Sequence, residues 1–232
     1  LLDVEPEKQK LMMDFSAFEK LLGIKALGFG DIKRDGNKLY YLDGDTKINI
    51  TKIYNRAIPE EFLSSGSDSV SCFKYSDDLD VEWSCHPSLE LRYSKFALPY
   101  LQHPNVPPSF ILSDMASFPE NLNDWVLKPL FSFGGHGVKI SPSQKDLDSI
   151  NDEDKKNYLL MKKVDYAPFI PDPDGDFSKA EVRLMCFKEG SNITPVIMWG
   201  RLTKSAIVNA DLNKTSKWTG GGPVFVKKNK TI

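Results

Sequence analysis

Hydrophobic positions near the start of the chain follow first a helical and then an alternating pattern. Over residues 14–22 apolar side chains recur at i, i+3 and i+4, and Gly23 follows as a stop signal. Residues 38–42 and 47–54 are rich in β-type side chains and flank a turn of aspartate and glycine. This pattern predicts a small α/β unit over residues 1–63.

The next segment, residues 64–82, is rich in serine and aspartate and has little periodicity, which predicts a connector. From residue 83 on, short apolar runs alternate with turn residues. The expected elements there are a helix over 86–104, a turn and short strand over 105–112, a strand, glycine-rich turn and strand over 123–142, a helix over 144–150 after Ser143, a buried strand over 158–164, a loop over 165–177, a hairpin of 180–187 and 194–202, and a polar loop that returns into a last strand. This order predicts an α+β fold dominated by antiparallel sheets.

The stretch "NDWVLKPLFSFGGHGVKISP" (123–142) places Lys128 on an apolar β-type run and follows it with three glycines. A lysine directed to solvent and an ordinary hairpin turn are the simplest interpretation. However, the apolar residues before Lys128 indicate a strand buried on both faces, and a buried ammonium needs an anionic partner. The turn is also longer than a hairpin requires, and glycines let backbone N–H groups approach an anion closely.

Two well-known phosphate motifs do not fit this stretch. A Walker A loop continues from its glycines into Gly-Lys-Ser/Thr, whereas Val138 and Lys139 follow Gly137 here. The glycine-rich loop of a protein kinase precedes its lysine, whereas Lys128 comes before the glycines. A lysine strand followed by a glycine-rich lid is therefore a different arrangement.

This arrangement resembles the ATP-grasp superfamily. "VLKPLFSFGGHGV" is similar to its lysine strand and lid, and "YLLMKKVDYAPF" is similar to its hinge strand. "EVRLMCF" and "VIMWGRL" stand where the superfamily carries arginines, and "SKWTGGGPVF" resembles a second glycine-bearing loop. The resemblance covers residues 83–226 and implies an ATP-grasp-like nucleotide-binding region over 83–232. The N-terminal part looks most like the circularly permuted branch, which includes glutathionylspermidine-synthetase-like carboxylate–amine ligases.

The resemblance implies roles for individual residues. The implied contacts to ATP are Lys95, Lys128, Gly134, Gly135, Gly137 and the backbone at Lys163 and Val164. Arg183 and Arg201 would act in catalysis by holding the transferring phosphate or the acceptor carboxylate, and Arg56 would face a carboxylate substrate. For Arg183 a surface ion pair with Glu181 is the simpler alternative. The superfamily's Glu-x-Asn metal pair does not follow the last strand, so Asp211 and Asn213 are the candidate metal ligands.

Composition and charge exclude several classes of protein. The net charge is −2, with 30 basic and 32 acidic residues, which argues against a nucleic-acid binder. Three scattered cysteines without CxxC spacing predict reduced thiols in the cytoplasm. No apolar run reaches the length of a membrane span, and the acidic start shows no secretory signal. The chain does not begin with methionine, and we expect it to be part of a longer protein.

The resemblance thus implies an ATP-dependent carboxylate–amine (or thiol) ligase that acts through an acyl phosphate, with ATP and Mg²⁺ as cofactors. Its substrates would be small molecules or peptides, and the pattern gives no oligomeric state. Two alternatives remain: a nucleotide-binding or interaction domain that lacks metal ligands and makes no product, and a phosphotransferase. The missing Glu-x-Asn pair favours the first alternative. A phosphotransferase needs a base near its acceptor, and no residue in the sequence is an evident candidate.

Overall fold

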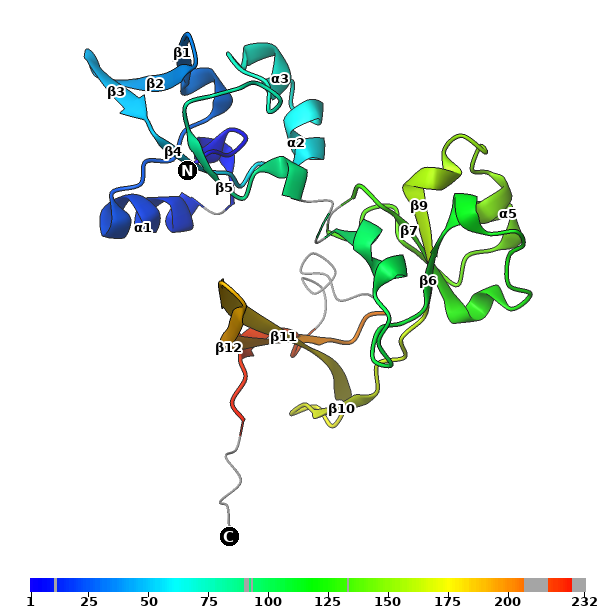
Figure 1. Ribbon diagram of the computed structural model, residues 1–232. Coiled ribbons are helices and arrows are strands. Elements are labelled where there is room, and N and C mark those ends of the chain that lie inside the picture. The colour runs from blue at the N-terminus through cyan, green and yellow to red at the C-terminus, as the bar shows by residue number, and fades with distance from the viewer. Residues whose placement is uncertain (11, 90–91, 93, 133, 207–216, 227–232) are drawn as a thin grey trace. The chain divides into compact units, whose positions relative to one another are not determined.

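The computed structural model describes residues 1–10, 12–89, 92, 94–132, 134–206 and 217–226 (Figure 1). The chain divides into two compact units, Leu1–Ala97 and Leu98–Ile232. The structure combines short helices with sheets that are mostly antiparallel, so the predicted α+β class is confirmed. No described helix has the length and hydrophobicity that a membrane crossing requires.

The first unit contains two small sheets and several short helices. Strands β1 (Lys33–Asp35), β2 (Lys38–Asp43) and β3 (Thr46–Ile50) form an antiparallel sheet in that order, and β4 (Lys52–Tyr54) pairs in parallel with β5 (Glu82–Ser84). The helical elements are η1 (Pro6–Lys8), α1 (Met12–Leu22), η2 (Phe29–Asp31), α2 (Pro59–Ser64), α3 (Ser67–Val70) and η3 (Pro87–Leu89). The predicted helix ends where expected, because Gly23 adopts a φ of +67° after Leu22.

A group of aromatic side chains forms part of the core of this unit, beside aliphatic residues such as Leu2 and Leu39. The rings of Phe29 and Phe62 lie 4.5 Å apart, and Phe73 and Tyr75 pack against the same group. Phe73 is buried, although it belongs to the segment 64–82 that was predicted as a connector. Part of that polar segment therefore contributes to a core, because a few large apolar residues at its end outweigh the surrounding serines and aspartates.

Two predictions for this part of the chain are wrong in detail. The strand predicted over 47–54 is interrupted at Thr51, since β4 leaves the antiparallel sheet to bury Ile53 beside β5. Among the described residues of 86–104, Pro87–Leu89 and Lys95–Tyr100 form the 3₁₀ elements η3 and η4, so the range is not one continuous α-helix. Pro99 inside η4 lacks the N–H that an α-helix needs, and this favours the 3₁₀ form over Lys95–Tyr100.

The second unit contains two four-stranded sheets. Strands β6 (Ser109–Ile111), β9 (Tyr158–Lys162), β7 (Trp125–Pro129) and β8 (Lys139–Ile140) form the first sheet in that order, with all neighbours antiparallel. The accompanying helices are η5 (Leu112–Asp114), η6 (Leu122–Asp124), α5 (Gln144–Asp148) and η7 (Lys155–Asn157). The strands predicted on either side of the glycine-rich turn are thus confirmed.

Alternation along the strands of this sheet separates a core face from an open face. Leu127 and Leu160 are almost fully buried and pack with Leu112 and Leu147, the latter on α5. Ser143 caps α5 as predicted, by accepting a hydrogen bond from the Asp146 N–H. The opposite face of β7 and β9 carries a different set of side chains, described below.

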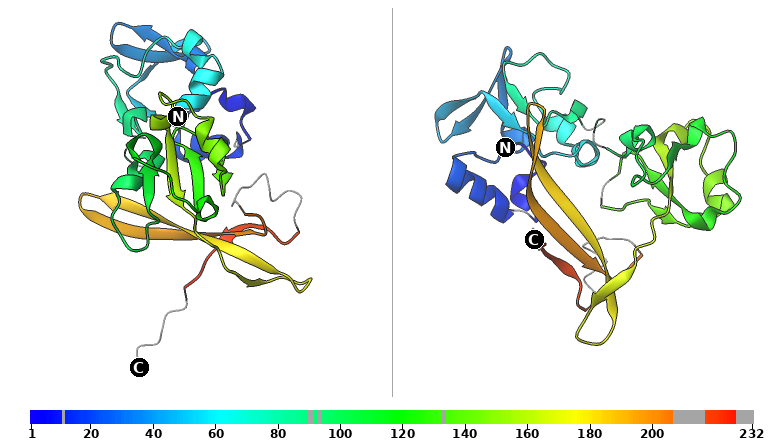
Figure 2. Two further views of the ribbon diagram at one scale, coloured as in Figure 1. Left: turned by 90° about the vertical axis from the view of Figure 1, so that its right-hand side faces the viewer. Right: turned by 60° about the horizontal axis from the view of Figure 1, so that its bottom comes forward.

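The second sheet is built around a long hairpin (Figure 2). Its order is β10 (Pro168–Pro171), β11 (Phe177–Glu189), β12 (Asn192–Thr203) and β13 (Gly220–Pro223). The predicted hairpin is confirmed. Residues 168–171 form a strand where a loop was expected, because β11 extends beyond the predicted hairpin and offers β10 an edge. The last strand comprises residues 220–223, which pair with β12.

Replacing Leu160 by alanine should destabilise the second unit by about 2–5 kcal/mol, because the removed side chain is fully buried and would leave a cavity. Leu101→Ala is the matched control. The Leu101 side chain is 52% exposed, so its truncation should change the free energy of unfolding by no more than about 0.5 kcal/mol. Urea unfolding measures both values. Equal effects of the two substitutions would contradict this description of the core.

Candidate functional site

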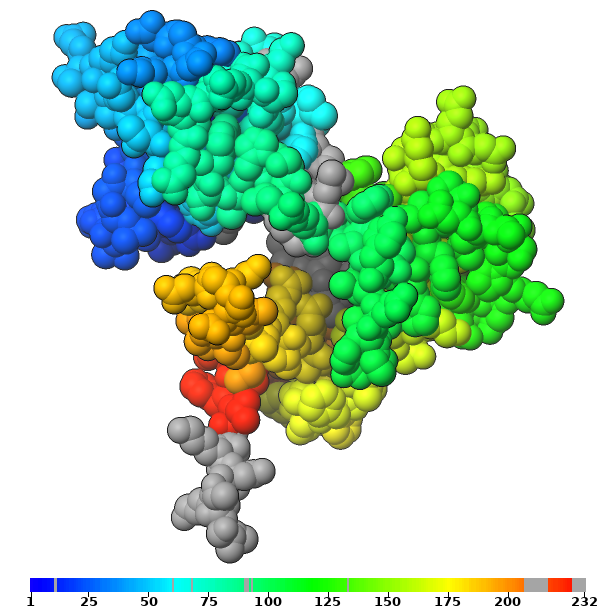
Figure 3. All heavy atoms as spheres, in the orientation of Figure 1, coloured from blue at the N-terminus to red at the C-terminus, as the bar shows by residue number. Residues whose placement is uncertain are grey.

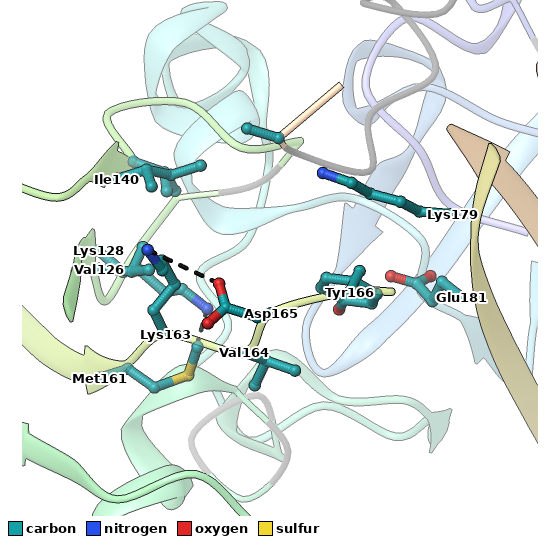
Figure 4. A pocket seen from close by; sticks show the side chains of 12 residues that line it. Val126, Lys128, Ile140, Met161, Lys163, Val164, Asp165, Tyr166, Lys179 and Glu181 are labelled. Atoms are coloured by element: carbon teal, nitrogen blue, oxygen red, sulfur yellow. Dashed lines mark hydrogen bonds and ion pairs between the residues drawn. The ribbon is translucent and has the colours of Figure 1, made fainter. Parts of the chain in front are cut away.

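A cleft of about 430 Å³ opens on the second unit, between the open face of the first sheet and the start of β11 (Figure 4). The cleft is lined by strands β7, β8 and β9, by the residues that follow β9, and by β11. The lining side chains include Val126, Lys128, Ile140, Met161, Lys163, Val164, Asp165, Tyr166, Lys179 and Glu181. The walls are thus apolar on the side of the first sheet and charged toward β11.

Lys128 enters the cleft because side chains alternate along β7. Leu127 points into the core, so its neighbours Val126 and Lys128 both face the cleft. The Lys128 ammonium is half-buried, and its contact is with the Met161 thioether, at 3.4 Å between Nζ and Sδ. No carboxylate of the described residues lies within ion-pair distance of it. Burial without a counter-charge lowers the pKa of Lys128 below its ordinary value.

Lys163 follows β9 and is held from two sides. Its side-chain ammonium donates to the Asn123 carbonyl at 3.0 Å and lies 3.7 Å from an Asp165 carboxylate oxygen. Its backbone N–H donates to the Asp124 carbonyl at 2.7 Å, so this N–H is already used. The Val164 N–H makes no hydrogen bond to another described residue, and the Val164 side chain lines the cleft. The backbone at Lys163 and Val164 was predicted to contact ATP. Because the Lys163 N–H is already hydrogen-bonded, the Val164 N–H is the donor of this pair that can bind a ligand.

Strand β11 supplies two charged side chains that the sequence reasoning did not assign to a site. Lys179 and Glu181 line the cleft, and with Arg183 they share one face of the strand. Tyr166 lies next to Glu181 in the same view (Figure 4), and burial together with that carboxylate raises the pKa of Tyr166. The alternation from Arg183 back to Lys179 predicts that the two share a strand face, but it does not predict that this face lines the cleft.

The two arginines predicted to be catalytic lie on the hairpin beyond the cleft wall. Arg183 donates from Nε to a Glu181 carboxylate oxygen at 2.5 Å, which is the ion pair weighed as its alternative role. Arg201 stands directly opposite Glu181 in the strand register, on the same face of the sheet. Glu181 thus lines the cleft and is the neighbour of both arginines on the hairpin. The catalytic roles of Arg183 and Arg201 stay predictions.

The predicted glycine lid forms a turn between β7 and β8. Gly134, Gly135 and Gly137 have φ values of +61°, +84° and +70°, in the left-handed region that glycine adopts most easily. At Gly137 a Cβ atom would lie 2.7 Å from Cγ of Pro129, so this position excludes any side chain. The turn leads into Val138, which lines the cleft.

The remaining predicted residues lie elsewhere in the chain. Lys95 begins η4 at the end of the first unit. Arg56 belongs to the first unit, where its guanidinium lies 5.0 Å from the centre of the Phe15 ring. Asp211 and Asn213 lie outside the described residues. The roles of these four residues stay predictions. Within the described ranges, no group of three or more histidine, cysteine or acidic side chains is arranged to hold a metal ion.

A lysine forms ion pairs with the acidic loop that follows β10, residues 172–176. The Asp172 carboxylate is almost fully buried, and its Oδ2 atom lies 2.6 Å from the Lys204 ammonium. Its Oδ1 atom accepts hydrogen bonds from the backbone N–H groups of Asp174 and Asp176. Lys204, which also pairs with Asp176, therefore neutralises part of the negative charge of this loop.

Several solved structures are similar in arrangement to this chain, and all three named here have folds of the ATP-grasp type. A glutathione synthetase-like effector (GSS30) from Globodera pallida, in the apo form, has 14% identity and a TM-score of 0.42, over 96% of this chain and 52% of its own. The macrocyclase MdnC from Microcystis aeruginosa, bound with the precursor peptide MdnA, has 12% identity and a TM-score of 0.48, over 98% and 78%.

The third is D-alanyl-alanine synthetase A from Vibrio cholerae, with 10% identity and a TM-score of 0.45, over 99% of this chain and 74% of its own. The chain therefore spans about half the length of the Globodera protein. No protein-family model and no curated protein matches the chain.

Gly137→Ala should lower the free energy of unfolding by about 1–3 kcal/mol more than Gly175→Ala. Both glycines have a positive φ, so alanine is strained at each, but only Gly137 would place its Cβ against Pro129. Gly175 has no atom within 4 Å of such a Cβ. Urea unfolding of the two variants checks the difference, and equal losses would show that the turn does not pack against Pro129.

Lys128→Met should make the ligand-free protein more stable at pH 7, because methionine has similar length and removes a half-buried charge. The folded-state pKa of Lys128 lies below the unfolded value of about 10.4, so the unfolded state binds more protons between the two values. Wild-type stability should therefore rise with pH in that window, and the advantage of the variant should shrink. Urea midpoints from pH 7 to 10 measure this. A pH-independent difference would contradict the burial of the ammonium.

Proposed function

We propose that the chain is the nucleotide-binding part of an ATP-dependent ligase that joins a carboxylate to an amine or a thiol. The observation that carries this proposal is the half-buried Lys128 ammonium, which faces the cleft without a carboxylate partner among the described residues. A desolvated ammonium gains most from an anion that binds directly beside it. A phosphate group of ATP is such an anion.

The charges around Lys128 favour a polyanion that carries an apolar group. Lys128, Lys163 and Lys179 line the cleft together with the carboxylates of Asp165 and Glu181. Val126, Ile140 and Met161 form an apolar wall beside these charges, of the kind that covers the faces of a nucleotide base. The Val164 N–H would donate to the base, and the phosphates would extend toward the lysines.

The glycine turn 134–137 would cover the phosphates. Its three glycines place backbone N–H groups in conformations that form anion-binding concavities, and they let the turn move without side-chain clashes. Covering the phosphates excludes water, which strengthens the interaction of each cation with the transferring group. Lys95 would add a further cation to the phosphates.

The proposed chemistry needs no nucleophilic side chain. A carboxylate oxygen of the substrate attacks the γ-phosphorus, which forms an acyl phosphate and releases ADP. The amine or thiol then attacks the acyl carbon, forms the new bond and releases inorganic phosphate with loss of its proton. The protein contributes positioning and positive charge, which are the main means of catalysing phosphoryl transfer. Arg183 and Arg201 would hold the transferring phosphate or the acceptor, and Arg56 would face the substrate carboxylate.

Mg²⁺ belongs to this proposal as the ion that accompanies ATP. Within the described residues, no three histidine, cysteine or acidic side chains gather as a metal site, and the phosphates of ATP would carry the ion. Asp165 and Glu181 are the carboxylates that line the cleft, and Asp211 and Asn213 remain candidates outside the described residues. The substrates would be small molecules or peptides, and the three free cysteines agree with a place in the cytoplasm. Membership of the circularly permuted branch is part of the same proposal.

One observation favours a second candidate function. Because the described residues hold no metal group, the chain could bind nucleotide and make no product. Release of ADP and inorganic phosphate in the presence of candidate acids and amines separates the two functions, since a binding domain releases neither at a rate above that of ATP alone.

ATP with Mg²⁺ should raise the melting temperature, and Lys128→Met should abolish this shift, because the variant loses the cation that the phosphates would contact. By linkage, a ligand at 100 times its Kd stabilises by about 2.7 kcal/mol, which corresponds to several degrees for a unit of this size. Differential scanning fluorimetry measures the shift for wild type and variant.

Lys162→Met is the matched control for this measurement. Lys162 is the neighbour of the cleft residue Met161 on β9, but its ammonium pairs with Asp124 at 3.1 Å and its side chain does not line the cleft. The control should keep the ATP shift. A wild-type melting curve that ATP leaves unchanged, or an equal loss of the shift in both variants, would reject a triphosphate site at Lys128.

A further inference from the structure

The β11–β12 hairpin has long stretches of strand edge without a partner. On one side, β10 pairs with residues 177–179 of β11 and with no described residue beyond them. On the other side, β13 pairs with residues 199–202 of β12, and the Val224 N–H extends this contact to the Met198 carbonyl. The outer half of the hairpin, toward the turn at Gly190, therefore presents two open edges among the described strands.

The same half of the hairpin is apolar on both faces. Figure 3 shows its side chains at the surface, coloured gold to orange. At least 46% of each large apolar side chain in this region is exposed: Val182, Leu184, Met185, Phe187, Ile193, Val196 and Ile197. An antiparallel sheet that faces water normally alternates apolar with polar residues, whereas strands buried on both faces are apolar throughout. The composition of the hairpin is that of a covered sheet.

The two open edges differ in how they are protected against pairing. The β12 edge carries Pro195, which lacks an N–H, and the register shifts there between Met185 and Cys186 of the facing strand. Proline and bulges are the usual means by which edge strands avoid a second chain. The β11 edge over residues 180–187 has neither, so it is the edge that can accept another strand.

We propose that two copies of this chain associate by antiparallel pairing of their β11 edges, with Cys186 on the two-fold axis. Glu189 and Asn192 flank the two-residue turn of the hairpin, and such a flanking pair is hydrogen-bonded. Counting back from Glu189, the N–H and C=O groups of every second residue point away from β12: Lys188, Cys186, Leu184, Val182 and Ala180. A second β11 can pair only with groups of this set, and this limits the possible registers.

Charge and shape favour one register over those in which the second copy lies closer to β10. With Cys186 on the axis, Arg183 faces Glu189 of the second copy, and Met185 faces Phe187 of the second copy, each twice by symmetry. A shift of two residues in one direction brings Glu181 against Glu189 of the second copy, which is repulsive. A further shift brings the turn of the second copy against β10 at Pro168, where the edge is already occupied.

The contact between the two copies is made by the strand edges. It consists of backbone hydrogen bonds between the two β11 strands and of contacts between neighbouring β11 side chains on each face. The symmetry is closed because the same edge serves both copies, so the pairing ends at a dimer and does not continue into a filament.

Sedimentation equilibrium of the 232-residue chain tests the proposal. The expected result is a dimer at micromolar concentrations and above. Leu184→Lys should raise the dimer dissociation constant at least tenfold, because the new ammonium faces Lys188 of the second copy twice. The double variant L184K/K188E should recover dimerisation, since opposite charges then face each other. Val196→Lys is the matched control: Val196 is 54% exposed and Leu184 55%, but Val196 lies on β12, so the control should stay dimeric.

Cross-linking of Cys186 tests the register directly. Hydrogen-bonded antiparallel neighbours have Cα atoms about 5.5 Å apart, within the range that a disulfide or a short bis-maleimide spans. In a Cys85→Ser background, which removes the other exposed thiol, the covalent dimer should form and should disappear with Cys186→Ser. A monomer at all concentrations would overturn the proposal, as would a dimer that Leu184→Lys leaves unchanged. A dimer without the Cys186 cross-link would overturn this register.

Discussion

The site depends on one unfavourable placement: the Lys128 ammonium on a strand whose other side chains build a core. The strand β7 cannot turn this residue to water without exposing Leu127, because alternate side chains point to opposite faces. The position of Lys128 is therefore set by the packing of Leu127 with Leu112, Leu147 and Leu160. The packing of the core thus holds the Lys128 ammonium where a ligand can neutralise it. The free energy cost of partly burying this ammonium is offset by the burial of apolar side chains on the core face of the sheet.

This separation of faces also explains how the cleft combines apolar and charged walls. On β9, Leu160 continues the core while Met161 and the following Lys163 face the cleft. On β11, alternation brings Lys179 and Glu181 to the same opening. The Asn123 and Asp124 carbonyls fix the end of β9 by accepting hydrogen bonds from the side chain and the backbone N–H of Lys163. The residues that build the cleft are thus positioned by ordinary sheet geometry, and only their charges are unusual.

Much of this arrangement could be predicted from the sequence because it follows from local patterns. The apolar run before Lys128, the capping residue Ser143 and the turn at Gly190 each leave a signal within a few residues. Lys179 was missed because its role depends on where β11 lies relative to another sheet, which alternation along one strand does not reveal. The broken helix at Pro99 was missed because apolar spacing was given more weight than the proline.

The same reasoning explains why the hairpin was predicted as a pair of strands but not as an exposed surface. Its apolar run indicates strands, and such runs are typical of strands that are buried on both faces. The sequence pattern does not show whether another element of the chain covers these strands. The structure separates the two statements, because β10 and β13 reach only the lower part of β11 and β12. Pro195 protects the edge of β12 against pairing with another strand, whereas β11 has no proline between Ala180 and Phe187. A strand edge that is regular and unprotected is consistent with an edge that has a partner, and a symmetric copy of the same edge satisfies its backbone groups and the charges of Arg183 and Glu189 together.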